Sequence, residues 1–139
     1  MLSVDPIQAL KNAYITTNTA LLVTDIHYMT SGCTCVTVYC KDNKMYVANT
    51  GDSRAVMASM DEFGRIVAHP LTRDHKPDDP DEMDRINRWG GYVRPPPEVG
   101  LSARVYLDAE HTMIGLAMSR SIGKKNNLAI ILWYFSFNT

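Results

Sequence analysis

The chain has 139 residues, a formal net charge of −1, 45% hydrophobic residues and 21% charged residues. This length suits one domain with its own core, and the composition is typical of globular proteins. The scattered lysines and arginines create no basic field, which argues against nucleic acid as a partner. Residues 1–5 lack the basic start and apolar run of a signal peptide. We expect a cytoplasmic or nuclear monomer that binds neither membrane nor nucleic acid.

Three cysteines lie close together, at Cys33, Cys35 and Cys40. An odd number without a signal peptide indicates free thiols in a reducing compartment. A zinc site would need a fourth ligand, and His27 is the only candidate nearby. Strand alternation puts Cys33 and Cys35 on one face and Cys40 on the other, which argues against shared coordination. We interpret the three cysteines as small residues of a strand.

Residues 5–23 are predicted to form a helix. Asp5 can cap its start, Pro6 fits the first helical position, and Gln8 stands where a capping-box partner would. An apolar stripe at helical spacing indicates that the helix packs on a sheet. The stripe comprises Ile7, Leu10, Tyr14 and Leu21.

Short strands separated by polar turns follow the first helix. They are predicted over residues 33–40, 45–49, 54–60 and 66–71. The links are too short for crossovers between parallel strands, so the pattern predicts an antiparallel meander. Within it, Val47–Val56 (VANTGDSRAV) is typical of a strand, a tight turn and a second strand, with Asp52 at the turn.

A second helix is predicted over residues 79–89. Asp79 can cap it, Pro80 takes the first position, and Glu82 stands three residues after the cap. Its apolar face comprises Met83, Ile86 and Trp89. Its exposed side carries the i,i+4 pairs Asp81–Arg85 and Asp84–Arg88. Two glycines at positions 90 and 91 end the helix.

The remaining segments are less regular. Residues 94–98 (RPPPE) form an extended connection or, alternatively, a docking segment for a partner. Residues 103–107 and 112–118 are predicted as short strands. The apolar run at 128–137 is shorter than the ~20 residues of a membrane-spanning helix, and we interpret it as a buried strand or an interfacial anchor. The sequence thus divides into a domain at 1–123 and a divergent hydrophobic tail at 124–139.

Motifs along the domain resemble those of the metal-dependent serine/threonine protein phosphatases of the protein phosphatase 2C family. They are SGCTC at 31–35, VANTGDSRAV at 47–56, LTRDHKPDDPDEMDRI at 71–86 with GGYV at 90–93, and GLAMSRSIG at 115–123. Four matches in the family's order and with suitable spacing argue against chance. The resemblance covers roughly residues 5–123.

The resemblance implies an α+β fold, a phosphatase 2C-like antiparallel β-sandwich flanked by helices, of which this chain holds the central part. It also implies hydrolysis of phosphoserine and phosphothreonine in protein substrates. In the family the attacking water bridges two Mg²⁺ or Mn²⁺ ions, which lower its pKa and stabilise developing charge. Such hard cations require oxygen ligands, chiefly aspartates and waters.

The sequence also departs from the family pattern. The resemblance implies a metal aspartate in an Asp-Gly-His-Gly-Gly segment, yet the chain contains no Asp-Gly dipeptide. Lys124 stands where the family usually has aspartate, and the resemblance stops there. Asp52 is the one matched position with a metal role, beside a third and weaker ion. We therefore name Asp52 as the candidate metal ligand and assign no catalytic residue.

Each candidate has a structural alternative. Asp52 could simply cap its own turn. His75, between Asp74 and Lys76, could move a proton, but we interpret it as the residue that fixes a turn. Arg54 and Arg120 could bind phosphate, or each could pair with a carboxylate such as Asp52 or Asp74.

The sequence supports two functional hypotheses. In the first, the chain is part of a metal-dependent protein phosphatase and has weak activity or none by itself. In the second, it is a non-catalytic binding module with a phosphatase-like fold, in which helix 79–89 and the segment before it recognise a partner. The four ordered motifs and the loss of the pattern at Lys124 motivate the first hypothesis, and the missing metal aspartates motivate the second.

Overall fold

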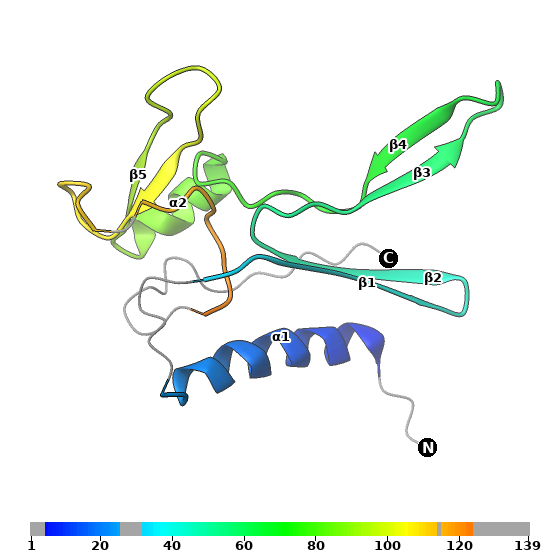
Figure 1. Cartoon of the computed structure of the whole chain (residues 1–139), viewed down its shortest axis with the longest axis horizontal. Helices are drawn as coiled ribbons and strands as arrows, with labels where there is room; N and C mark the ends of the chain where they lie inside the picture. Colours follow the sequence, from blue (N-terminus) through cyan, green and yellow to red (C-terminus); the bar gives the residue numbers. More distant parts are fainter. Residues whose placement is uncertain (1–4, 26–31, 114, 124–139) are drawn as a thin grey trace.

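The computed structural model describes residues 5–25, 32–113 and 115–123 (Figure 1). The elements in chain order are α1 (Pro6–Leu22), β1 (Cys35–Lys41), β2 (Lys44–Thr50), β3 (Val56–Met60), β4 (Ile66–Pro70), α2 (Pro80–Arg88), β5 (Tyr92–Arg94) and β6 (Arg104–Tyr106). The strands form three two-stranded antiparallel sheets, β1–β2, β3–β4 and β5–β6. The predicted α+β class is confirmed. His27 and the tail at 124–139 lie outside the described residues.

The predicted four-stranded meander is wrong. β2 pairs with β1, from Cys35 opposite Thr50 to Lys41 opposite Lys44. β3 pairs with β4 instead of with β2. The stretch VANTGDSRAV is therefore a link between two hairpins rather than a hairpin itself. The physical reason is that the backbone of Gly51 at the end of β2 is bonded to His75, not to β3.

The predicted strand at 112–118 is also wrong. Among the residues of this segment that the structure describes, 112–113 and 115–118, the strand pairing is limited to an isolated bridge between Leu116 and Val105 of β6. Asp108 accounts for part of the difference, because its carboxylate accepts hydrogen bonds from the backbone nitrogens of Thr112, at 2.7 Å, and Met113, at 2.6 Å. These bonds fold residues 108–113 into a turn, and a side chain that bonds nearby backbone in this way competes with a strand ladder.

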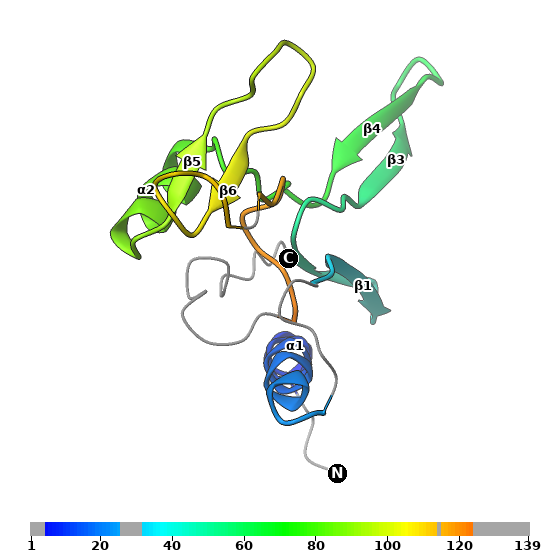
Figure 2. The ribbon, with the colours of Figure 1, turned by 60° about the vertical axis from the view of Figure 1, so that its left-hand side comes forward.

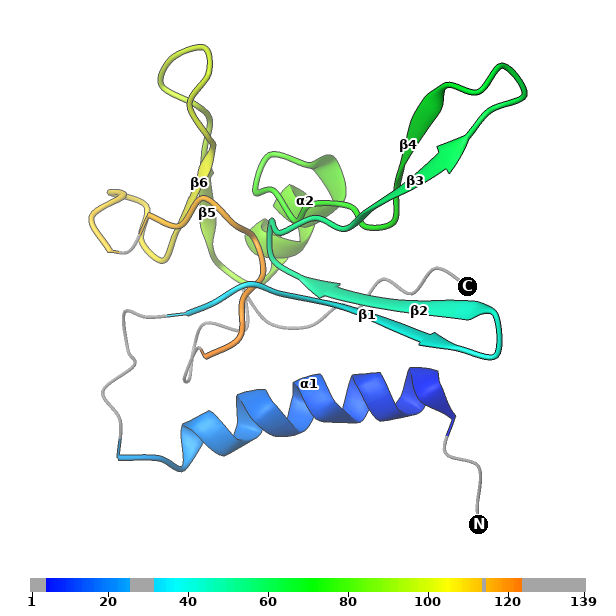
Figure 3. The same cartoon turned by 45° about the vertical axis from the view of Figure 1, so that its right-hand side comes forward.

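Helix α1 lies along the β1–β2 hairpin (Figure 3). The Asp5 carboxylate accepts a hydrogen bond from the nitrogen of Ile7 at 3.0 Å, which confirms the predicted cap. Gln8 donates to Asn12 instead of completing a capping box. Tyr14 is buried, and its hydroxyl donates to the carbonyl of Ala48 at 3.1 Å. The cluster that joins helix and hairpin comprises Tyr14, Ala48 and Ile122, with Leu10, Leu21 and Cys35 against it.

Helix α2 packs against β5–β6, and its Ile86 is fully buried beside Val105. Its buried stripe is narrower than predicted, because Met83 is 37% exposed and Trp89 63% exposed. The predicted cap is also wrong: the Asp79 side chain makes no capping bond and pairs with Arg73. Arg73 lies just before the helix and offers a charge-assisted partner, which replaces the weaker bond to backbone N–H.

The predicted i,i+4 ion pairs on α2 are wrong as well. Asp81 pairs with Arg73, and Arg85 pairs with Glu82 one position closer than predicted. Arg88 donates to the backbone oxygen of Asp84 rather than to its carboxylate. Asp81 takes a tertiary partner, Arg73, because a solvated i,i+4 pair would stabilise by only about 0.5 kcal/mol at most.

Residues 115–123 connect the two halves of the structure (Figure 2, orange). At one end Leu116 bridges to Val105 of β6. At the other, Ile122 bridges to Cys33, and the nitrogen of Gly123 donates to Asn18 of α1 at 3.0 Å. This segment therefore belongs to both hydrophobic clusters.

The β3–β4 hairpin projects away from the rest of the structure (Figure 1). It exposes large apolar side chains, among them Met60, Phe63 and Ile66. Among the described residues, no helix has the length and apolar character to cross a membrane. The three cysteines are free, as predicted.

Candidate functional site

The candidate site begins at the turn that follows β2. Gly51 has a φ of 102°, which favours glycine. A Cβ at this position would overlap the Thr34 side chain, so a side chain is excluded by contact as well as by backbone conformation. The nitrogen of Gly51 donates to Nδ1 of His75 at 3.0 Å, and the nitrogen of His75 donates back to the oxygen of Gly51 at 3.0 Å. Three of the sequence motifs therefore meet at Gly51.

His75 is a structural residue of this turn. Its side chain is buried, and desolvation together with the charge of Arg120 lowers its pKa to about 4. Nδ1 accepts a hydrogen bond from the nitrogen of Gly51 and so carries no proton itself, which leaves the ring neutral in this arrangement. The carbonyl of His75 accepts from the nitrogen of Ser119 at 2.9 Å. The interpretation of His75 as a turn-fixing residue is confirmed.

Asp52 follows Gly51 directly. Its Oδ2 accepts a hydrogen bond from Nζ of Lys76 at 2.7 Å, and the two side chains are 25% and 34% exposed. No hydrogen bond from Asp52 to its own turn is found within the described residues. The structure therefore brings the candidate metal ligand Asp52 into contact with Lys76. The hydrogen bonds between their chain neighbours Gly51 and His75 hold the two segments together.

Arg54 and Asp74 form the neighbouring pair. Nε and Nη2 of Arg54 donate to the two carboxylate oxygens of Asp74 at 2.8 and 3.0 Å. These bonds hold the pKa of Asp74 below its usual value. Of the two partners weighed for Arg54 in the sequence, Asp74 is the one it contacts. Its guanidinium is therefore already neutralised by a carboxylate.

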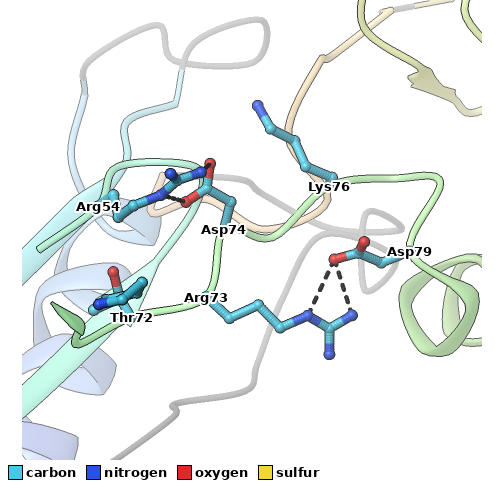
Figure 4. A pocket seen from close by; sticks show the side chains of 7 residues that line it. Arg54, Thr72, Arg73, Asp74, Lys76 and Asp79 are labelled. Atoms are coloured by element: carbon cyan, nitrogen blue, oxygen red, sulfur yellow. Dashed lines mark hydrogen bonds and ion pairs between the residues drawn. The ribbon is translucent and has the colours of Figure 1, made fainter. Parts of the chain in front are cut away.

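A surface pocket of about 440 Å³ lies beside these pairs (Figure 4). Its lining is Arg54, Pro70, Thr72, Arg73, Asp74, Lys76 and Asp79. Each of the three cations in this lining is paired with a carboxylate: Arg54 with Asp74, Arg73 with Asp79 and Asp81, and Lys76 with Asp52. The pocket therefore offers a phosphate group no unneutralised cation.

A buried ionic cluster underlies the site. Glu82 is 2% exposed, and its Oε2 accepts from Oγ of Ser119 at 2.5 Å and from Nε of Arg120 at 2.9 Å. Arg85 donates to the same carboxylate at 2.9 Å. Burial by itself would raise the pKa of Glu82, but the bonds from Arg120, Arg85 and Ser119 lower it to about 2. The cluster fixes α2 to the SRSIG segment.

The sequence does not predict this cluster. The spacing after Asp79 puts Glu82 in a capping box, and the motifs offer Asp52 and Asp74 as carboxylate partners of Arg120. One signal was present: Glu82 lies four residues before Ile86 and so shares the buried face of α2. A glutamate on a buried helical face requires a cationic partner, because a charge without one is costly to bury.

The described residues do not form a complete metal centre. They contain no group of three or more histidine, cysteine, aspartate or glutamate side chains that could hold an ion. Asp52 supplies one carboxylate, and Lys76 already neutralises it. Mg²⁺ and Mn²⁺ are held by several oxygen ligands, so Asp52 alone could contribute only one ligand of a larger site.

Comparison with known proteins agrees with the motifs and the fold. Residues 2–129 match the family model of Protein phosphatase 2C. The chain belongs to the protein phosphatase 2C family. The resemblance stated from four motifs is thereby confirmed.

Among curated relatives, the Probable protein phosphatase 2C 12 of Oryza sativa subsp. japonica is 44% identical over 93 residues, which cover 67% of this chain and 24% of that protein. The Protein phosphatase 2C homolog 3 of Schizosaccharomyces pombe is 36% identical over 129 residues, which cover 89% of this chain and 27% of that protein. The chain thus spans about a quarter of the length of these phosphatase 2C relatives.

A solved structure shares the same arrangement. The serine-threonine phosphatase 2C from Toxoplasma gondii superposes with a TM-score of 0.77 at 25% sequence identity. The match covers 94% of this chain and 44% of that phosphatase. The three hairpins and two helices are therefore a part of the phosphatase 2C fold.

Proposed function

We propose that this chain is a segment of a metal-dependent phosphatase that removes phosphate from phosphoserine and phosphothreonine in proteins. The observation that carries the proposal is the family match over residues 2–129, in which the GDSR turn is held by the DHKP segment. For the chain by itself we propose little or no activity, because its described residues offer one carboxylate and no cluster that could hold metal.

Bound Mg²⁺ or Mn²⁺ would supply an attacking water of lowered pKa and charge that stabilises the phosphoryl transition state. The contribution of this chain would be one carboxylate, from Asp52, to an accessory ion. The Gly51–His75 contact would hold Asp52 in position. Lys76 would have to leave the Asp52 oxygen that it now occupies.

A chimera tests the phosphatase assignment. Residues 5–123 would replace the matching segment of the Toxoplasma gondii phosphatase, whose remaining chain supplies the rest of the fold. We expect Mn²⁺-dependent release of phosphate from a phosphothreonine peptide, and a weaker dependence on Mn²⁺ after Asp52→Ala. Asp84→Ala, at an exposed aspartate of α2, is the matched control. A folded chimera without turnover would contradict the assignment.

The low activity of the chain alone has its own test. Purified chain of 139 residues would be assayed with p-nitrophenyl phosphate and Mn²⁺. We expect a rate at the uncatalysed background. Robust turnover that disappears in Asp52→Ala would show that the chain is an enzyme by itself.

The second candidate function is a non-catalytic binding module with a phosphatase fold. The lack of a metal-holding cluster in the described part of the chain favours it. A monodisperse, folded chain whose chimera also lacks turnover would support this function, whereas an active chimera would exclude it.

A further inference from the structure

The β5–β6 hairpin has one buried and one outward face. Val93 and Val105 are paired and pack against Ile86 of α2. Because successive side chains of a strand point to opposite faces, the residues on either side of these valines face outward. They form two cross-strand pairs, Tyr92 with Tyr106 and Arg94 with Arg104. Two arginines therefore stand directly opposite each other on the outward face.

This arrangement carries an uncompensated charge. Like charges directly opposite each other destabilise a sheet. Within the described residues, neither Arg94 nor Arg104 takes part in a salt bridge, although Nη1 of Arg104 donates to the carbonyl of Gly115 at 2.6 Å. Arg54 and Arg73, in contrast, are each held by aspartates. The arginine pair is a local surplus of positive charge, and an anion placed between its members would relieve their repulsion.

A cavity of about 150 Å³ lies at this pair. It is lined by Arg94, Pro95, Pro97, Ser102, Arg104 and Tyr106. The prolines restrict the backbone of the rim, and the two hydroxyls add hydrogen-bond donors. Tyr106 is itself held, because its ring contacts the His111 ring in a tilted arrangement, with centroids 4.7 Å apart. The arginine and hydroxyl donors around the cavity are therefore held in place by the hairpin and by a loop whose prolines restrict its backbone.

We propose that this arginine face binds acidic side chains of a peptide, and that it selects protein substrates with glutamate or aspartate near the phosphorylated residue. The assignment to substrates rests on the proposed phosphatase function. A planar guanidinium binds a carboxylate through two parallel hydrogen bonds, and arginine clusters are a recurring means of recognising acidic motifs. The cavity has room for individual side chains. A nucleic acid is a poorer occupant, because two arginines neutralise few phosphates.

The direct test is binding to labelled peptides. Fluorescence anisotropy would compare a fluorescein-labelled peptide with three consecutive glutamates and the same peptide with glutamines, in EDTA and at low salt. We expect the glutamate peptide to bind the chain about tenfold or more tightly than the glutamine peptide, since two charge-assisted contacts are lost in the latter. Equal affinity for both peptides would overturn the proposal. So would binding of a phosphoserine peptide without glutamates in preference to the glutamate peptide.

Variants locate the site. Arg94→Gln removes one charge of the pair and leaves the bond between Arg104 and Gly115 in place. We expect it to weaken binding of the glutamate peptide about fivefold, with partial recovery in Arg94→Lys. Arg88→Gln is the matched control, because Arg88 is exposed and also donates to a backbone oxygen. An equal loss in Arg88→Gln would show that binding follows net charge and would overturn the assignment to this face.

These measurements separate the two proposals. Peptide binding in EDTA requires neither metal nor turnover, so it can be measured even if the chimera is inactive. Selective peptide binding with an inactive chimera would overturn the phosphatase assignment and support the arginine face as a site for acidic side chains. Equal binding of the two peptides with an active chimera would overturn only the proposal for the arginine face.

Discussion

Gly51 and His75 exchange two hydrogen bonds, one from the nitrogen of Gly51 to the His75 ring and one from the nitrogen of His75 to the oxygen of Gly51, each at 3.0 Å. Their chain neighbours Asp52 and Lys76 form an ion pair directly beside this contact. The GDSR and DHKP motifs are thus one structural unit. The geometry of the candidate metal ligand depends on a buried, neutral histidine.

The first prediction concerns the pH dependence of stability. The pKa of His75 is about 4 in the folded chain and 6.5 in the absence of structure. As the pH falls, the unfolded chain therefore binds the proton first, and the folded state loses stability between about pH 6.5 and pH 4. Urea unfolding at pH 7 and pH 5 should differ by roughly 2 kcal/mol through this group.

Variants of two histidines test that assignment. His75→Asn should remove most of the difference between pH 7 and pH 5, whatever its cost at pH 7. His69→Asn, at an exposed histidine in β4, should leave the difference unchanged. A pH dependence that persists in His75→Asn would assign it to another group.

The second prediction compares the loss of stability when two glycines are replaced by alanine, one limited by backbone strain alone and one also by close contact. Gly51 and Gly64 both have positive φ, 102° and 74°, but only Gly51 has atoms against the position of a Cβ. Gly64→Ala should cost about 1 kcal/mol, which is the strain alone. Gly51→Ala should cost at least about 2 kcal/mol more, because Thr34 must move as well. Similar losses in urea unfolding of the two variants would contradict the close approach of Gly51 to Thr34.

The third prediction concerns the buried carboxylate of Glu82. Glu82→Gln removes the buried carboxylate charge that pairs with both Arg85 and Arg120. Breaking a buried ion pair in this way costs about 3–5 kcal/mol, which should be measured as a lower midpoint of urea unfolding at pH 7. Glu62→Gln, at an exposed glutamate in the β3–β4 turn, should change stability by less than about 0.5 kcal/mol. Comparable effects of the two substitutions would show that the cluster is not closed to solvent.

The sequence allowed correct prediction of elements whose signals are local. The Asp5 cap, the apolar stripe around Tyr14 and the two helices follow from spacing and capping chemistry, and the structure has them. The pairing of the strands, in contrast, depends on contacts between residues far apart in the chain. Turn residues at Gly51–Ser53 favoured a hairpin, but bonds to His75, 24 residues away, direct the chain from one sheet to another.

The candidate site shows the same division. Asp52 and His75 could be named from motifs, whereas the contact of Asp52 with Lys76 arises from the meeting of two loops. The charges of α2 were assigned to neighbours on the helix, yet Asp81 and Glu82 are bound by Arg73 and Arg120 from outside it. Ion pairs between distant segments leave no periodic signature in a sequence, so local spacing alone does not predict them.

The fourth prediction concerns metal affinity at Asp52. The Lys76 ammonium and a divalent cation compete for the same carboxylate oxygen, since Nζ lies 2.7 Å from Oδ2. In the chimera, where Asp52 would be one ligand of a larger site, removing the ammonium by Lys76→Met should therefore strengthen Mn²⁺ binding by about two- to fivefold, which corresponds to a partly exposed ion pair of about 1 kcal/mol or less. Titration followed by the electron paramagnetic resonance of free Mn²⁺ measures this without turnover. Adding Asp52→Asn to Lys76→Met should abolish the gain, and a gain that survives would place the Mn²⁺ at another carboxylate.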